Sequence, residues 1–127
     1  MQEATILIAD EDQSTLNKLK ELLVKDGYSV ITAIDGVDAV TKAAISSLKV
    51  VITNLNMPLF PGLKVLERIK KFYPQLHVIM MSDISPEETK RKALEFGAYS
   101  FLEKPIDPFI LRKQIKDIFN QHVNVKP

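Results

Sequence analysis

The sequence contains no cysteine, and this absence excludes disulfide bonds, thiol nucleophiles, iron–sulfur clusters and cysteine-based zinc sites. Glycine is scarce: the four glycines stand apart from one another, so no glycine-rich loop is available to cradle a phosphate. No apolar run approaches the ~18 residues of a membrane span, and the N-terminal segment lacks the basic and then apolar pattern of a secretory signal. Redox, dinucleotide-binding and membrane-spanning classes are therefore disfavoured.

The sequence also lacks an excess of either positive or negative charge. Seventeen Lys and Arg residues face 16 Asp and Glu residues, which gives a formal net charge of +1. This balance supplies no basic field for direct contact with nucleic acid or with a membrane surface. The 127 residues are 46% hydrophobic and 26% charged, which is ordinary globular usage. We expect a soluble, cytoplasmic single domain over residues 1–127, with a core at about 4–121 and a polar tail or linker start at 122–127.

Short apolar runs recur along the chain, and polar or turn residues follow each of them. They are rich in valine, isoleucine and aromatic residues, which is typical of strands buried on both faces of a sheet. The runs lie at residues 4–9, 28–33, 49–53, 76–82 and 99–102.

Stretches with helical periodicity separate these runs. Gly27 and Gly97 are expected to end two of the helices, and Pro86 is expected to begin another. The alternation of five strands with five helices predicts an α/β fold, a five-stranded parallel sheet with helices on both faces. The apolar positions expected to face the sheet are Leu16, Leu19, Leu22 and Leu23; Val37, Val40 and Ala44; Leu63, Leu66, Ile69 and Phe72; Ala93, Leu94 and Phe96; and Leu111, Ile115, Ile118 and Phe119.

Polar groups follow four of the predicted strands. Parallel sheets bind ligands beyond the carboxyl ends of their strands, so these groups are expected to converge at one edge. Acid and amide oxygens without histidine or cysteine suit Mg²⁺, and a nearby lysine suits one oxygen of a phosphoryl group. The pattern therefore indicates a Mg²⁺-phosphoryl site. The segments are Asp10-Glu11-Asp12, residues 54–58 (NLNMP), Ser82-Asp83 and Glu103-Lys104-Pro105.

The order ILIADED, NLNMP, MMS and LEKP resembles the receiver domain of two-component response regulators, over about residues 5–120. The resemblance implies a (βα)5 flavodoxin-like fold that accepts a phosphoryl group from a sensor histidine kinase or phosphotransfer protein. It also implies a Mg²⁺ site at Asp10, Glu11 and the Asn56 backbone carbonyl. Further roles follow for single residues: Ser82 as switch hydroxyl, Phe101 as switch aromatic and Lys104 as the site lysine, with a cis Lys104–Pro105 bond.

One position departs from the family pattern in a way that changes the chemistry. Residues 54–58 align with the D-x-x-M-P motif, so the acceptor position holds Asn54. An amide cannot form the acyl phosphate that receivers use. Three acids and a lysine would sum to −3 + 1 = −2, whereas two acids and Lys104 sum to −2 + 1 = −1. We therefore expect no phosphorylation at Asn54 and weak or absent Mg²⁺ binding.

Two explanations of Asn54 remain open from the sequence. An engineered Asp→Asn substitution would block the domain, and the retained Asp10, Glu11, Ser82 and Lys104 favour it. A naturally degenerate pseudo-receiver is the other, and Asp83 favours that reading because an acid beside the site would repel a phosphodonor. Pro61 is a further mild departure from the family.

Several candidate residues also have purely structural interpretations. Asp12 is expected to cap a helix start rather than bind metal. Phe101 taken alone is a core aromatic, and His77 and His122 are expected to be partly exposed strand and tail residues. The methionines at positions 57, 80 and 81 are expected to anchor a loop and fill the core.

A face spanning residues 85–118 is a candidate for contact with an output domain or a dimer partner, as the resemblance implies. Its mixed charges at helical spacing are more often those of a solvated surface.

Two other functions fit the sequence less well. A Mg²⁺-dependent phosphatase or dehalogenase-like hydrolase is the alternative, but it requires a strand-end Asp nucleophile and a cap domain. A flavin or nucleotide binder would need a glycine-rich cradle. We therefore expect a signalling domain and no enzyme.

Overall fold

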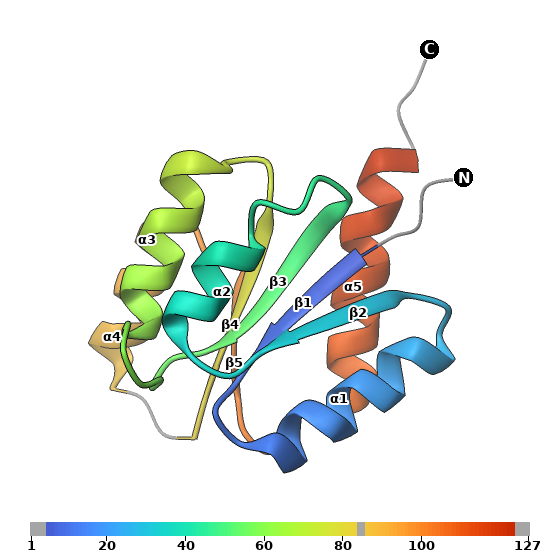
Figure 1. Ribbon diagram of the computed structural model, residues 1–127, viewed down its shortest axis with the longest axis horizontal. Helices are drawn as coiled ribbons and strands as arrows, with labels where there is room; N and C mark the ends of the chain where they lie inside the picture. Colours follow the sequence, from blue (N-terminus) through green and yellow to red (C-terminus); the bar gives the residue numbers. More distant parts are fainter. Residues whose placement is uncertain (1–4, 84–85, 124–127) are drawn as a thin grey trace.

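The structure of the protein is a computed structural model, which describes residues 5–83 and 86–123, with side chains to Asn120. Within these residues strands and helices alternate along the chain (Figure 1). The strands are β1 (Thr5–Ala9), β2 (Ser29–Ala33), β3 (Leu48–Asn54), β4 (His77–Ser82) and β5 (Ser100–Glu103). The helices are α1 (Gln13–Lys25), α2 (Gly36–Lys42), α3 (Gly62–Phe72), α4 (Glu87–Glu95) and α5 (Pro108–Val123).

The strands form one parallel sheet in the order β2-β1-β3-β4-β5. From the central strand β1 the chain first adds β2 on one side of the sheet. It then crosses to the other side of β1 and adds β3, β4 and β5 in turn. The predicted flavodoxin-like α/β fold is confirmed. The point between β1 and β3, where the strand order reverses, is where such sheets place their ligands.

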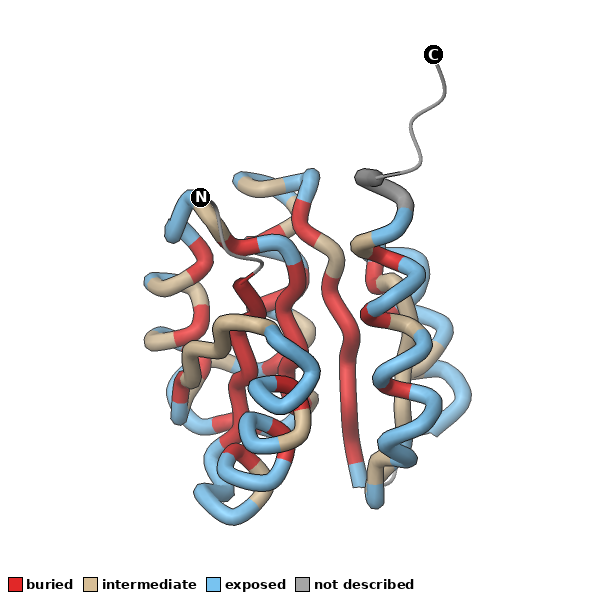
Figure 2. The backbone as a smooth tube through the Cα atoms, turned by 90° about the vertical axis from the view of Figure 1, so that its right-hand side faces the viewer, coloured by how far each residue is buried: buried red, intermediate tan, exposed pale blue. Residues whose placement is uncertain are grey.

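Alternate residues of the central strands face opposite layers. Ile6 and Ile8 of β1 pack with α1 and α5, whereas Leu7 and Ala9 pack with α2, α3 and α4. Buried residues accordingly concentrate along the strands between the two helical layers (Figure 2). The edge strand β5 and most of β2 are only half-buried, so the expectation of burial on both faces was wrong there. Each edge strand has a neighbour on one side only.

The predicted apolar faces were correct for α1 and α5 and partly wrong for the other helices. Val37 is 51% exposed, Phe72 57% and Leu94 50%, and Ala44 and Phe96 are exposed as well. Small residues make the contact instead: Ala39 and Ala43 at α2, and Ala93 of α4. A short helix contacts the sheet along one narrow stripe, so apolar residues outside that stripe remain exposed.

The helix boundaries follow the predicted signals. Gly27 (φ 97°) and Gly97 (φ 104°) follow the ends of α1 and α4 in the left-handed region. Pro86 immediately precedes α4. Helix α5 extends to Val123, so the first part of the expected tail is helical, and residues 124–127 lie outside the described residues. No described helix has the length and apolar character required to cross a membrane.

Gly36 allows the loop before α3 to press against the start of α2. A Cβ at position 36 would lie 2.1 Å from the backbone oxygen of Phe60. We expect Gly36→Ala to lower the free energy of unfolding by about 3 kcal/mol, at the upper end for overpacking. Gly27→Ala is the control, because no atom lies within 4 Å of a Cβ at position 27 and only the positive φ disfavours a side chain there. We expect this variant to lower the free energy of unfolding by about 1 kcal/mol. Urea unfolding measures both, and an equal or smaller loss for Gly36→Ala would contradict the steric account.

Candidate functional site

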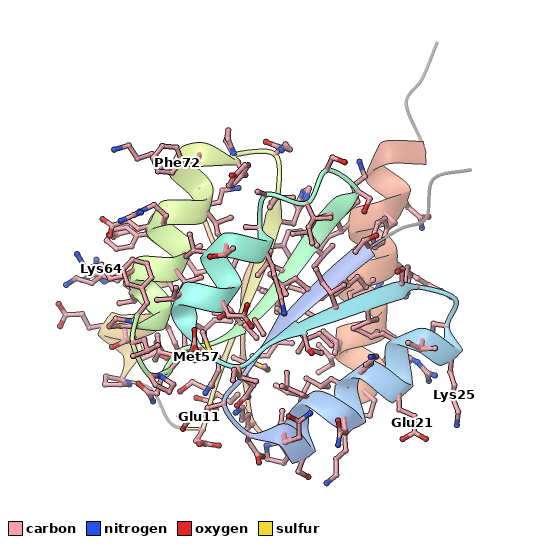
Figure 3. All side chains as sticks on the ribbon, viewed as in Figure 1. Glu11, Glu21, Lys25, Met57, Lys64 and Phe72 are labelled. Carbon is pink, nitrogen blue, oxygen red and sulfur yellow. The ribbon has the colours of Figure 1, made fainter. Side chains whose placement is uncertain are left out.

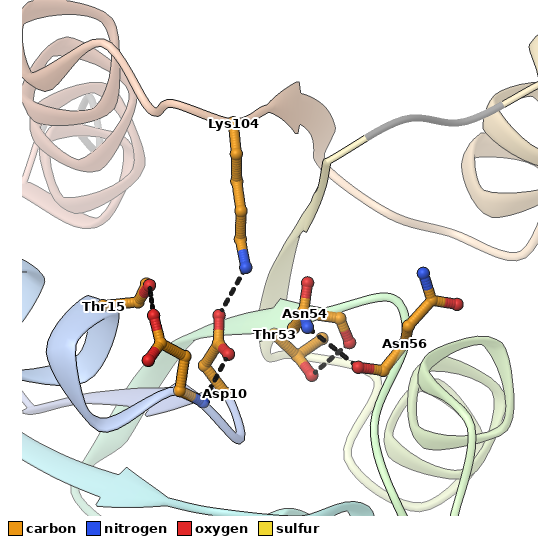
Figure 4. A network of polar contacts seen from close by, with 7 residues as sticks. Asp10, Thr15, Thr53, Asn54, Asn56 and Lys104 are labelled. Atoms are coloured by element: carbon orange, nitrogen blue, oxygen red, sulfur yellow. Dashed lines mark hydrogen bonds and ion pairs between the residues drawn. The ribbon is translucent and has the colours of Figure 1, made fainter.

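The ends of four strands bring the predicted site residues to one edge of the sheet. Ala9 of β1 pairs with Thr53 of β3, and the next residues are Asp10 and Asn54. Ser82, the last residue of β4, pairs with Glu103 of β5, and Lys104 follows directly. The register of the sheet therefore places Asp10, Asn54, Ser82 and Lys104 at the same edge, and Figure 4 shows Asp10, Asn54 and Lys104 there.

Asp10 and Lys104 form a buried ion pair. The Lys104 Nζ donates to Asp10 Oδ2 at 2.7 Å, and the side chain of Asp10 is only 1% exposed, against 14% for Lys104. The Lys104 backbone N–H donates to the Ser82 carbonyl at 2.7 Å, and the Lys104–Pro105 bond is cis, as the resemblance implied. The other oxygen of Asp10 accepts from the Asp12 N–H at 2.9 Å. Both carboxylate oxygens of Asp10 are therefore engaged by the chain itself.

Asn54 makes a contact that an aspartate could not make. Its buried side chain donates from Nδ2 to the backbone oxygen of Asn56 at 2.8 Å. A carboxylate has only acceptors, so this hydrogen bond depends on the amide. Among the described residues, no hydrogen bond joins Asn54 to the Asp10–Lys104 pair, and Figure 4 shows the two groups side by side.

The donor set fits Mg²⁺ poorly in this arrangement. The Asn56 carbonyl already accepts from Asn54, and Asp10 already holds an ammonium group and a backbone N–H. Mg²⁺ demands near-octahedral oxygen ligands and one or two free carboxylates. In the part of the chain that the structure describes, no group of three or more acidic, histidine or cysteine side chains is placed to hold a metal. Glu11 offers an exposed carboxylate at this edge (Figure 3).

The remaining predicted residues lie in different surroundings. Ser82 is fully buried, whereas Asp83 and the side chain of Asn56 are exposed. Phe101 of β5 is half-buried and packs against the core cluster on the α3 side of the sheet. The methionines at positions 57, 80 and 81 are buried in the core, as predicted.

The two histidines were expected to be structural. His77 is half-buried in β4, and the centre of its ring lies 5.7 Å from the centre of the Tyr99 ring in an edge-to-face arrangement. The side chain of His122 lies outside the described residues.

Asp12 occupies the N-cap position of α1, as expected, but its side chain binds differently. Its Oδ2 accepts from the Thr15 hydroxyl at 2.7 Å, and no side-chain hydrogen bond to the helix backbone is made. This hydroxyl contact lowers the pKa of the Asp12 carboxyl below its ordinary value. The sequence reasoning missed Thr15, although its spacing of three residues from the cap was a usable signal.

Comparisons with known proteins agree with this geometry. The family described as response regulator receiver domain matches residues 6–116. Chemotaxis protein CheY of Treponema pallidum is 33% identical over 105 residues, which cover 80% of this chain and 73% of that protein. The alkaline phosphatase synthesis transcriptional regulatory protein PhoP of Bacillus subtilis is 28% identical over 116 residues, which cover 91% of this chain but only 48% of PhoP.

The fold has close structural neighbours as well. A response regulator receiver domain protein (CheY-like) from Methanospirillum hungatei superposes with a TM-score of 0.90 at 26% identity, covering 97% of this chain and 99% of that one. The matched residues include all four strand ends that form the site. The chain therefore belongs to the response regulator receiver domain family of two-component signalling proteins.

Proposed function

We propose that residues 1–127 act as a single receiver domain in which Asn54 occupies the phospho-acceptor position and blocks phosphorylation there. The observation that carries this proposal is the position of Asn54, buried at the carboxyl end of the central strand β3 and at the same edge as the Asp10–Lys104 pair. Receiver domains are signalling domains rather than classical enzymes, and nothing here favours a hydrolase.

The amide at position 54 supports a fixed conformation rather than a phosphorylation switch. Phosphorylation would add about −1.5 to −2 charges at this edge, which could draw in Lys104 and the Ser82 hydroxyl. Without that charge Lys104 remains paired with Asp10, and the Asn54 amide donates its hydrogen bond to the backbone carbonyl of Asn56. The retained Asp10–Lys104 pair and the Ser82 hydroxyl support the assignment of Asn54 as the residue that blocks phosphorylation.

Mg²⁺ binding tests this assignment directly. Receiver domains normally bind Mg²⁺ at the acceptor site, but here a neutral amide replaces an anionic ligand. We expect the chain to bind Mg²⁺ roughly tenfold or more weakly than its Asn54→Asp variant, because a full charge is missing from a hard-cation site. Isothermal titration measures both affinities, with Asn56→Asp as a control that adds an exposed carboxylate nearby. Equal affinity of the native chain and Asn54→Asp would contradict the proposal.

Receiver domains pair with histidine kinases or phosphotransfer proteins, and output domains also occur. We propose that an output domain or a dimer partner contacts the 85–118 face. Residue 85 of this face lies outside the described residues. Exposed apolar side chains support this choice: Leu94 on α4 is 50% exposed, and Phe109 and Ile110 on α5 are 74% and 44% exposed.

Charge reversal tests whether that face is an interface. Lys90 pairs with Glu87 at 3.7 Å, and Arg91 pairs with Glu95 at 2.7 Å. We expect the double variant Lys90→Glu, Arg91→Glu to weaken self-association or output-domain binding about tenfold, since several like charges would meet the partner. Sedimentation measures self-association, and titration with the output domain measures the other contact.

The control for the charge reversal is Lys25→Glu, Lys49→Glu, which makes the same change in net charge at the opposite end of the sheet. Unchanged binding in the Lys90→Glu, Arg91→Glu variant would contradict the proposal that this face is an interface.

A further inference from the structure

Three aliphatic side chains are exposed around the start of α2 and in the loop before α3. Leu59 is 75% exposed, Ile34 54% and Val37 51%. Ile34 and Val37 flank the start of α2, and Leu59 lies in the loop between β3 and α3. The Gly36 N–H donates to the Pro58 carbonyl at 3.2 Å, which joins the two segments. Folding therefore leaves these three side chains together at the surface.

Leu59 is held in a conformation that leucine disfavours. Its φ is 72°, in the left-handed region, where a non-glycine residue costs about 1–2 kcal/mol. Such strain persists only where the surroundings enforce it, and it clusters at functional surfaces. Here the enforced conformation displays a large apolar side chain to solvent, which folding alone does not require.

A row of cations on α3 lies next to Phe60, the residue that follows Leu59 in the sequence. Lys64, Arg68 and Lys71 recur at helical spacing and are exposed, with Glu67 among them, so the row carries +3 − 1 = +2. None of the three cations has an ion-pair partner among the residues described here, whereas Lys90 and Arg91 on α4 each face glutamates. Lys64 and Phe72 point outward from α3 (Figure 3).

The aromatic rings near this row are already occupied. The Arg68 guanidinium lies 5.4 Å from the centre of the Phe60 ring, and Lys71 Nζ lies 5.5 Å from that of Phe72. Single-stranded nucleic acid relies on open aromatic faces for stacking. Because a cation of the chain already lies over each ring, we favour carboxylates over nucleic acid as the groups that meet the row.

We propose that Ile34, Val37, Leu59, Lys64, Arg68 and Lys71, the α2–α3 surface, dock an acidic amphipathic segment of a partner protein. Its aliphatic residues would cover Leu59 and its neighbours, and its carboxylates would face the cation row. Charge complementarity selects this occupant over a second copy, because the glutamates of α4 are already paired within the chain. The proposal is independent of the state of Asn54.

The probe is a short, fluorescently labelled amphipathic helical peptide with leucines on one face and glutamates beside them. The matched control peptide carries lysines in place of the glutamates. We expect at least tenfold tighter binding of the glutamate peptide to the full chain in fluorescence anisotropy. Backbone amide shifts in NMR spectra are expected to concentrate at residues 34–37 and 58–72.

Two variants separate the surface from the fold. Leu59→Gly removes the anchor and relieves the strained φ, so affinity should fall about tenfold while the melting temperature holds or rises. The double variant Lys64→Glu, Lys71→Glu should also bind the glutamate peptide about tenfold more weakly. The control double variant Lys25→Glu, Lys49→Glu should keep its affinity. Equal binding of both peptides, shifts confined to residues 86–118, or unchanged affinity in Leu59→Gly would overturn the proposal. So would concentration-dependent self-association or oligonucleotide binding through the same residues.

Discussion

Replacing Lys104 by methionine is expected to lower the free energy of unfolding by about 3–5 kcal/mol, because it leaves a carboxylate buried without its partner. Asp10 is 1% exposed and receives the Lys104 ammonium at 2.7 Å. The backbone N–H of Asp12 alone then faces the charge. Urea unfolding at neutral pH measures the loss. Lys20→Met on the exposed face of α1 is the control, and it should change stability by less than about 0.5 kcal/mol.

The double variant Asp10→Asn, Lys104→Met separates the ion pair from the loss of either side chain. With both charges removed no buried carboxylate is left unpaired, so the double variant should be more stable than Lys104→Met alone. A loss of under about 1 kcal/mol in Lys104→Met would mean that the pair behaves like one at an exposed surface. That result would contradict the burial on which the account of this site depends.

The arrangement of the fold was predictable because it depends on patterns that are local in sequence. Apolar runs of strand length alternate with helical stripes, and glycine and proline mark the helix ends. The helix faces were predicted less well, because periodicity does not report how far each helix overlaps the sheet. Val37 and Phe72 satisfy the helical pattern, yet both are exposed.

The site was predictable as a set of positions but not as a set of contacts. The strand-end rule identified Asp10, Asn54 and Lys104. The pairing of Asp10 with Lys104 spans 94 residues of sequence. The spacing of residues in the sequence does not specify which acidic side chain a lysine pairs with. The Asn54 bond to the Asn56 carbonyl depends on loop geometry, and so does the left-handed φ of Leu59.

Position 54 is expected to decide whether the domain accepts a phosphoryl group. In Asn54→Asp, a carboxylate oxygen can form a bond to phosphorus while the bond from the donor to phosphorus breaks, which yields an acyl phosphate. The neutral amide of Asn54 has no anionic carboxylate oxygen that could form this bond. Asn56→Asp is the matched control, because it adds the same charge at the same edge on an exposed side chain away from the strand end.

The most direct test is intact-mass spectrometry after incubation of the native chain, Asn54→Asp and Asn56→Asp with acetyl phosphate and Mg²⁺. The account predicts one added phosphoryl group on Asn54→Asp and none on the other two proteins. Equal labelling of the native chain would contradict the claim that Asn54 blocks the reaction. Absence of labelling in Asn54→Asp would contradict the claim that Asn54 alone blocks it.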